Sequence, residues 1–235
     1  MSLPLLILQP GQKLPSLAAV PGDFSDWILA GMGRDPAAVP VLHPEQGDVL
    51  PPPAEVGAVV ITGSGAMVTE QAPWMLASAA WLRELVALGR PVLGICFGHQ
   101  LLADALGGEV ADNPRGIEVG TVITRPTAAA AQDVLFAGWP ADAPVQASHQ
   151  QAVIRLPDGA VALAASEQDP HHAFRYGERT WGIQFHPEFD ARIVTAYEGY
   201  YAPRLDVDYR DRLPRRRAES PQGRAILRAF SELAP

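Results

Sequence analysis

Residues 91–100 read Pro91-Val92-Leu93-Gly94-Ile95-Cys96-Phe97-Gly98-His99-Gln100. The first half is a short apolar run, typical of a buried strand that ends at Ile95. A helix is predicted from Phe97 onward, with apolar residues on one face and Gly107-Gly108 as its stop: Leu101, Leu102, Ala105 and Leu106. Cys96 therefore lies at a strand-to-helix turn, and glycines two positions away on both sides relieve the crowding there. Gly-x-Cys-x-Gly is the thiol form of the nucleophile elbow.

Cys96 is predicted to act as a nucleophile. A helix N-terminus and a protonated imidazole both favour a thiolate. The N–H of Phe97, the next residue, would point to the place where an oxyanion forms. The alternative is a small buried core residue, which is the usual role of a free cysteine. The elbow and its two glycines favour the nucleophile.

A nucleophilic thiol requires an imidazole nearby, and two identical tripeptides offer one. His43-Pro44-Glu45 lies in a loop rich in proline and glycine, so we expect a turn there. His186-Pro187-Glu188 follows an apolar strand, residues 181–185, and strand ends are where α/β enzymes place their chemistry. Residues i and i+2 of an extended chain point the same way, so Glu188 is predicted to orient His186 towards Cys96.

The surrounding pattern predicts an α/β fold with a mostly parallel central sheet flanked by helices. In the first half, buried strands are expected at residues 4–8, 39–42, 58–62 and 92–95, with an amphipathic helix over 74–88. In the second half, shorter strands at 119–124, 145–147, 161–166, 172–176 and 181–185 add some antiparallel pairing. Helices are expected at 190–201 and 222–233, and residues 201–221 are expected to form a solvated connection.

Composition restricts the classes of function. The chain has 235 residues, 48% hydrophobic, with a formal net charge of −8, which argues against a nucleic-acid binder. It contains no apolar run of about 20 residues that could span a membrane, and Leu3 to Leu8 is interpreted as a first strand, not a signal peptide. A single cysteine fits a cytoplasmic protein. One domain over residues 1–235 is expected.

Other motifs are given ordinary roles. Gly63-Ser64-Gly65 lacks the Gly-Lys-Ser/Thr that a phosphate loop requires, and Gly31-Met32-Gly33 is too short for a dinucleotide site. His171-His172, near Asp169, is interpreted as a turn or surface pair, since adjacent strand residues face opposite ways. Arg215 to Arg217 is interpreted as a solvated charge run. Neither a cofactor nor a metal site is expected.

The motifs together resemble class I glutamine amidotransferases, which use a Cys-His-Glu triad, and most resemble stand-alone proteins similar to the amidotransferase domain of GMP synthase. The resemblance rests on Gly-Ile-Cys-Phe-Gly-His-Gln and on Gly-Ile-Gln-Phe-His-Pro-Glu. Further segments occur in the family order, over about residues 58–190: Val60-Ile61-Thr62-Gly63-Ser64-Gly65, Gly116-Ile117-Glu118-Val119-Gly120 and Ser148-His149-Gln150-Gln151.

The resemblance implies a flavodoxin-like fold, with a catalytic segment at about 58–190 and a C-terminal helical extension at about 190–235. It implies that Cys96 forms a γ-glutamyl thioester while His186 moves the proton and Glu188 orients His186. It places oxyanion donors at Phe97 and at Ser64 or Gly63. It assigns the two ends of glutamine to Gln100 and to the main chain at Ser148 and His149.

Three functions remain open from the sequence. The first is release of ammonia from L-glutamine, with the ammonia passed to a separate synthetase. The second is hydrolysis of another γ-glutamyl compound, such as a peptide or conjugate, by the same triad. The third is a non-catalytic regulatory module on the same fold, against which the intact triad argues.

Overall fold

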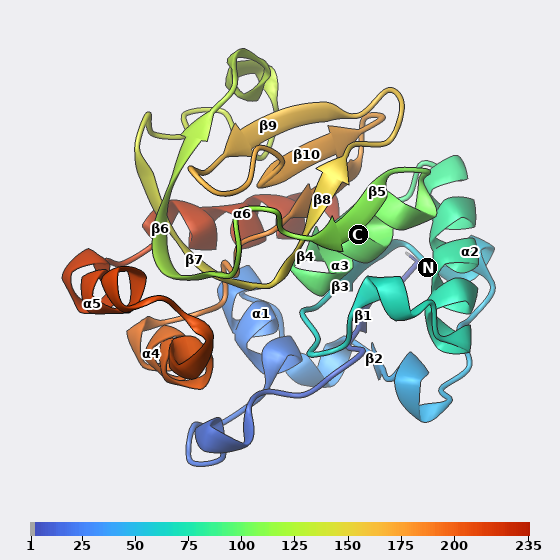
Figure 1. The fold of residues 1–235 in the computed structure, drawn as a ribbon. Coiled ribbons are helices and arrows are strands. Elements are labelled where there is room, and N and C mark those ends of the chain that lie inside the picture. Colours follow the sequence, from blue (N-terminus) through green and yellow to red (C-terminus); the bar gives the residue numbers. More distant parts are fainter. Residues whose placement is uncertain (1–2) are drawn as a thin grey trace.

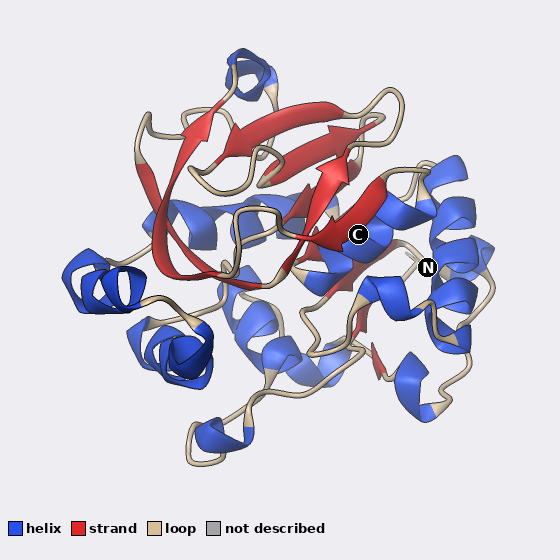
Figure 2. Ribbon diagram, viewed as in Figure 1, coloured by secondary structure: helices blue, strands red, loops and turns tan. Residues whose placement is uncertain are grey.

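The computed structural model describes residues 3–235 and is built around a mixed nine-stranded sheet (Figure 1, Figure 2). The strand order is β2-β1-β3-β4-β11-β10-β9-β6-β7. The strands are β1 Leu5–Leu8, β2 Val41–Leu42, β3 Ala58–Ile61, β4 Val92–Ile95, β6 Glu118–Pro126, β7 Ala143–His149, β9 Val161–Ala165, β10 Ala173–Tyr176 and β11 Thr180–Ile183. A separate antiparallel pair joins β5 (Glu109–Asp112) to β8 (Gln151–Arg155).

The parallel half of the sheet runs from β2 to β11, and helices cover both of its faces. In β1, Leu5 and Ile7 join one buried cluster, which includes residues of α1 (Phe24–Met32) and α6 (Pro221–Leu233). Leu6 and Leu8 face the opposite cluster, which includes residues of α2 (Pro73–Ala87) and α3 (Phe97–Ala105). This alternation buries both faces of each strand, as expected for a parallel sheet covered on both sides.

The antiparallel half runs from β11 through β10, β9 and β6 to β7. Two further helices, α4 (Ala191–Tyr201) and α5 (Val207–Arg216), pack against β6. Short 3₁₀ turns connect the main elements: η1 Pro15–Leu17, η2 Pro36–Ala38, η3 Pro44–Gln46, η4 Pro53–Glu55, η5 Val68–Glu70, η6 Ala128–Gln132 and η7 Ala202–Arg204. Across residues 3–235, none of the helices combines the length and apolar character needed to cross a bilayer.

The predicted α/β fold with helices flanking a partly parallel sheet is confirmed. Four of the five parallel strands, β1 to β4, are the ones that the alternation of apolar runs and helices predicted, and β11 from the second half extends them. The mixed character is pronounced, because four neighbouring strand pairs are parallel and four are antiparallel. The sequence pattern did not predict α1, β5 or β8.

The connection expected over residues 201–221 is largely exposed, as predicted, but it contains η7 and α5, which were not predicted. The Asp206 side chain caps α5 by accepting a hydrogen bond from the Tyr209 N–H at 2.7 Å. The Tyr209 hydroxyl donates to the Val119 carbonyl oxygen at 3.0 Å, and Leu213 is buried. Arg217, expected in a solvated charge run, donates to the buried Glu198 carboxylate at 3.0 Å. These contacts fasten the segment to β6 and α4.

Candidate active site

Cys96 lies at the turn between β4 and α3 in a backbone conformation that is rare for a residue with a side chain. Its φ is 52° and its ψ is −104°. The Cys96 N–H donates to the Ile183 carbonyl oxygen of β11 at 2.9 Å, which ties the turn to the neighbouring strand. Since such a conformation costs of order 1–3 kcal/mol and persists only where the surroundings impose it, the fold holds Cys96 at the elbow that the sequence predicted.

The glycines on either side of Cys96 permit close contacts between backbone segments. A Cβ on Gly94 would come within 3.0 Å of the Gly98 carbonyl oxygen, and a Cβ on Gly98 would come within 3.0 Å of the Ile61 carbonyl oxygen. The Gly98 N–H donates to the Thr62 carbonyl oxygen at 3.2 Å. These contacts bring the start of α3 against the end of β3.

His186 and Glu188 follow β11, which lies beside β4 in parallel register with Ile183 opposite Ile95. The His186 Nδ1 and Glu188 Oε1 atoms are 2.7 Å apart, and both side chains are almost fully buried. The His186 ring stacks on Phe189, with 3.9 Å between the ring centroids. The structure therefore places the two residues at the same sheet edge as Cys96. His43 lies in the predicted turn instead, against η3, with Nδ1 3.0 Å from the Gln9 carbonyl oxygen.

Charge favours the protonated form of His186. Burial alone lowers the pKa of an imidazole, but the Glu188 carboxylate and the Cys96 sulfur outweigh it and raise the pKa of His186 to about 10. Burial and the same two groups also raise the pKa of the nearby Tyr197 hydroxyl above its usual value. The arrangement can hold a positive imidazolium next to a sulfur atom.

The glycine-rich loop after β3 lies against the His186 ring. A Cβ on Gly63 would be 2.8 Å from His186 Cε1, so this position has room only for glycine. The Ser64 hydroxyl donates to the Pro10 carbonyl oxygen at 2.6 Å and accepts from the Ala66 N–H at 3.1 Å. As the first residue of α3, Phe97 has no intrahelical acceptor for its N–H.

Cys96, His186, Ser64, Gly65 and Ser148 line a single cavity of about 100 Å³. Its opposite wall comes from α4 and η7 and was not predicted: Tyr197, Tyr200, Tyr201 and Arg204. The Arg204 guanidinium lies over the Tyr201 ring, 4.5 Å from its centroid, and 4.8 Å from that of Tyr200. We name these four side chains the roof. Their spacing of three and four residues is that of one helix face, in and just after the helix expected at 190–201, but it gave no sign that this face would meet Cys96.

Of the three residues expected to hold the ends of a substrate, Ser148 lines the cavity, whereas His149 and Gln100 do not. Ser148 lines the cavity, and its carbonyl oxygen lies 3.7 Å from the Cys96 sulfur. The His149 ring turns away and contacts Glu118. Gln100 is not among the residues that line this cavity, and its amide donates to the Gln151 carbonyl oxygen at 2.8 Å and to Gln184 Oε1 at 3.0 Å. The expectation that Gln100 contacts a substrate stays a prediction, and in this structure its side chain links α3 to Gln151 and Gln184.

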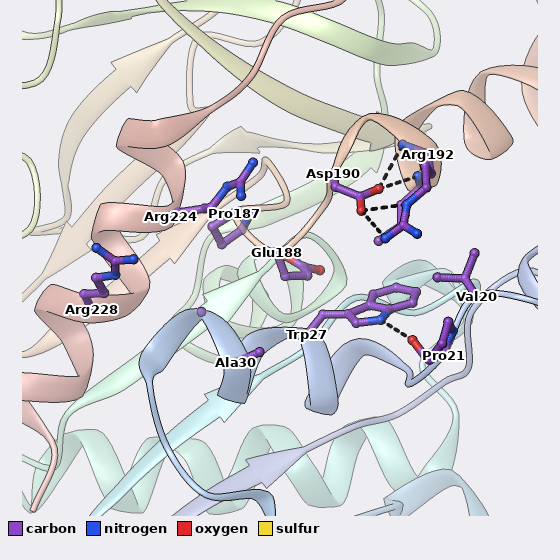
Figure 3. A pocket seen from close by; sticks show the side chains of 12 residues that line it. Val20, Pro21, Trp27, Ala30, Pro187, Glu188, Asp190, Arg192, Arg224 and Arg228 are labelled. Carbon is purple, nitrogen blue, oxygen red and sulfur yellow. Dashed lines mark hydrogen bonds and ion pairs between the residues drawn. The ribbon is translucent and has the colours of Figure 1, made fainter.

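A larger cavity of about 470 Å³ lies on the other side of the Pro187-Glu188 segment (Figure 3). Trp27 and three arginines, Arg192, Arg224 and Arg228, contribute to its lining. Asp190 binds Arg192 there at 2.8 Å. Cys96 is not one of the lining residues, so this cavity is separate from the thiol.

Comparisons with known proteins agree with this geometry. Residues 44–194 match the family described as Glutamine amidotransferase class-I. The GMP synthase [glutamine-hydrolyzing] of Pyrobaculum aerophilum is 37% identical over 149 residues, which cover 63% of this chain and 27% of that protein. The corresponding protein of Leifsonia xyli is 42% identical over 104 residues, covering 43% and 20%. The chain thus spans about a quarter of the length of these relatives.

Solved structures match over the whole fold. The crystal structure of a glutamine amido transferase from Methylobacillus flagellatus superposes with a TM-score of 0.77 at 25% identity, covering 100% of this chain and 96% of that one. A glutamine amidotransferase from Thermotoga maritima gives a TM-score of 0.75 at 23% identity, covering 99% and 98%. The second likeness, at its low identity, concerns the fold.

Proposed function

The chain belongs to the class I glutamine amidotransferase family, and from this we propose that it hydrolyses the side-chain amide of L-glutamine through a thioester on Cys96. The observation that carries the proposal is the shared cavity. Cys96, at its strained elbow, and His186 both line it, and Glu188 Oε1 lies 2.7 Å from His186 Nδ1. A thiol, an imidazole and an orienting carboxylate in this order are the parts of a nucleophilic acyl transfer.

In the first half of the reaction, His186 takes the thiol proton and the Cys96 sulfur attacks the amide carbon. The C–N bond then breaks, His186 returns the proton to the nitrogen, and ammonia leaves a γ-glutamyl thioester behind. In the second half, His186 removes a proton from water, the hydroxide attacks the thioester carbon, and glutamate departs as the sulfur regains its proton. Glu188 orients His186 and balances its positive charge in both halves.

We assign the oxyanion to two backbone donors. The Phe97 N–H is free of the helix and follows the nucleophile directly, which supports its assignment. The second donor is Ser64 or Gly63, on a loop that borders both the cavity and the His186 ring. Donors held in place before the reaction stabilise the developing charge without having to reorganise.

We assign the two charged ends of glutamine to the rest of the cavity. The main chain at Ser148 and His149 can hold the α-amino end through its carbonyl groups. Arg204, in the roof, can hold the α-carboxylate, because its guanidinium reaches the cavity and a guanidinium fork matches a carboxylate. The ammonia product would pass to an acceptor site on a synthetase, and the GMP synthase relatives are the reason to look for one.

The test is ammonia release from L-glutamine by the purified protein, with Cys96→Ala and His186→Ala as inactive variants. The repeated tripeptide supplies a matched control, since His43→Ala alters the same sequence motif at a different place and is expected to retain activity. Labelling of Cys96 by the glutamine analogue 6-diazo-5-oxo-L-norleucine provides a readout that does not require an acceptor. Ammonia release that survives Cys96→Ala would contradict the mechanism.

The same assay separates free glutamine from other γ-glutamyl compounds. We expect turnover of glutamine and little of γ-glutamyl dipeptides, in keeping with the family to which the chain belongs. Turnover of the dipeptides without turnover of glutamine would replace the proposed substrate while keeping the thioester chemistry.

A further inference from the structure

Three residues from separate segments form a buried polar cluster behind the cavity. Glu118 begins β6, His149 ends β7 directly opposite it, and His172 precedes β10. Glu118 Oε2 lies 2.8 Å from His149 Nε2 and 2.9 Å from His172 Nε2. All three side chains are at most 2% exposed. The interpretation of His171-His172 as a turn or surface pair holds as to the turn, but His172 is not at the surface, because the turn directs its ring inward.

Hydrogen-bond geometry determines the protonation of His149. Its Nδ1 lies 2.8 Å from the Gln151 carbonyl oxygen, which can only accept, so Nδ1 carries a proton. Its Nε2 faces the Glu118 carboxylate, which also only accepts when ionised. Two acceptors on two nitrogens require two ring protons. His149 is therefore an imidazolium paired with a carboxylate, whereas His172 needs a proton only on the nitrogen that faces Glu118.

The charged groups around His149 agree with this geometry. Burial lowers the pKa of His149, but the hydrogen bond and charge of Glu118, with Asp169 and Cys96 beyond, raise it to about 9. Burial raises the pKa of Glu118, yet the two histidines hold it well below its usual range. A buried ion pair of this kind contributes little net stability, so its presence next to a nucleophile calls for another role.

The cluster connects to Cys96 through one residue. Ser148 precedes His149 in β7, lines the cavity, and presents its carbonyl oxygen 3.7 Å from the Cys96 sulfur. The hydroxyl of Ser166, the residue after β9, donates to Glu118 Oε1 at 2.7 Å and holds the carboxylate in place. With Glu118, Ser166 and Gln151 all bound, the end of β7 cannot shift without breaking charged contacts.

We propose that Glu118, His149 and His172 form a positioning network that places the Ser148 carbonyl against the Cys96 thiol and sets a fixed positive charge behind it. The network deepens the proposed function, because it rests on Cys96 being the nucleophile. It assigns the His149 side chain a second role beside that of its main chain. None of the three side chains touches the substrate, so they are positioning residues and not catalytic ones.

The first test examines the native protein and requires no variant that could fail to fold. Histidine ring ¹⁵N spectra at pH 7.5 are expected to show both nitrogens of His149 protonated and His172 as the tautomer with its proton on Nε2. Assignment uses the loss of one ring's signals in His172→Gln. A neutral His149 ring at pH 7.5 would overturn the proposal.

The second test measures the rate at which iodoacetamide alkylates the protein across a range of pH. Cys96 is the chain's one cysteine, so incorporation reports on this thiol alone. In Glu118→Gln the rate of alkylation at pH 7 is expected to fall about tenfold, because His149 loses the carboxylate that keeps it protonated and its positive charge no longer favours the thiolate. The neighbouring His171, whose ring contacts the Val153 carbonyl oxygen instead, provides the control His171→Gln with an unchanged profile.

The outcomes separate the network from other causes. A variant that has unfolded would show the alkylation profile of the denatured wild-type chain and lose its near-ultraviolet circular dichroism. A folded Glu118→Gln with the wild-type profile would overturn the proposal. A stoichiometric divalent metal in the purified protein that is absent from Glu118→Gln would also overturn it. The metal ion would then take the place of the ring protons of His149 and His172 that face Glu118.

Neither measurement uses glutamine. If glutamine is not hydrolysed but the alkylation and ¹⁵N results hold, the proposed substrate fails and the network stands. If glutamine is hydrolysed and the Glu118→Gln profile does not move, the network fails alone.

Discussion

Gly94 and Gly98 lie face to face across the turn that holds Cys96, and a Cβ on Gly94 would meet the Gly98 carbonyl oxygen inside 3.0 Å. Gly98 is crowded in the same way, because a Cβ there would lie within 3.0 Å of the Ile61 carbonyl oxygen. Backbone atoms therefore pack against the turn on both sides of Cys96. The position of the thiol is therefore fixed by backbone atoms, which cannot move aside as a flexible side chain would.

Gly94→Ala is expected to lower the free energy of unfolding by about 1–3 kcal/mol, the cost of forcing extra volume into a packed site. Urea unfolding followed by circular dichroism measures it. Gly199→Ala is the matched control: nothing lies within 4 Å of a Cβ at this position in α4, so the change should be neutral or stabilising. Equal stability of Gly94→Ala and the wild type would contradict the packing argument.

Gly63→Ala is expected to act on His186 rather than on the fold. The added Cβ would lie 2.8 Å from His186 Cε1, which is too close, so the imidazole must move relative to Cys96. We expect this movement to slow thiol alkylation and ammonia release. The activity should fall by about 100-fold, as a displacement of about 1 Å in a reacting group can cause. Gly199→Ala, in α4 with nothing within 4 Å of its Cβ and outside the cavity lining, should retain activity. A fully active Gly63→Ala would argue against the proposed role of His186.

Stability is expected to decrease as the pH rises above about 6.5. The folded pKa of His149 is raised to about 9 and that of His186 to about 10, above the value of about 6.5 in an unfolded chain. The stabilisation is thus complete below pH 6.5 and is lost as the pH passes through the folded values. Each linked proton contributes at most about 1.4 kcal/mol per pH unit.

Urea unfolding at pH 6, 7.5 and 9 measures this slope, and His186→Gln should reduce it by removing one of the two linked protons. Stability that stayed constant or rose between pH 7 and 9 would show that the histidines are neutral in the folded chain.

Arg204→Gln is expected to raise KM for glutamine by about tenfold, since a hydrogen bond to a charged group contributes about 1.5–3 kcal/mol. The value of kcat should change little, because the α-carboxylate is remote from the bond that breaks. Steady-state kinetics measure both constants. Arg212→Gln, an exposed arginine on α5, is the control with an unchanged KM. An unchanged KM in Arg204→Gln would move the carboxylate site elsewhere in the cavity.

The sequence predicted what depends on local pattern and missed what depends on distant partners. The strands around Cys96 and the His186-Glu188 pair were predictable, because each follows from apolar runs, turn glycines and i, i+2 spacing. Helix α5 was not, since Leu213 is its one buried residue and Pro214 lies inside it. Its place comes from Tyr209, which reaches Val119 ninety positions earlier in the chain.

The same reasoning explains why the surroundings of His172 and Gln100 were not predicted. The burial of His172 depends on Glu118, 54 residues away, and no periodicity connects the two. Gln100 has a family position that implies substrate contact, but its amide is engaged by Gln151 and Gln184. The roof residues belong to a segment whose packing is set by β6, so their arrival over Cys96 could not be inferred from their own sequence.

The roof residues border the route by which a substrate reaches Cys96. The space above Cys96, about 100 Å³, is smaller than the roughly 300–1,000 Å³ of ordinary small-molecule pockets. The side chains of Tyr200, Tyr201 and Arg204 border this space, so their positions determine how much room a glutamine molecule finds beside the thiol. Helix α5 follows η7 directly along the chain and lies on the outside of the molecule (Figure 1). A protein that bound α5 could therefore shift the roof residues and change the rate of turnover without contacting the thiol.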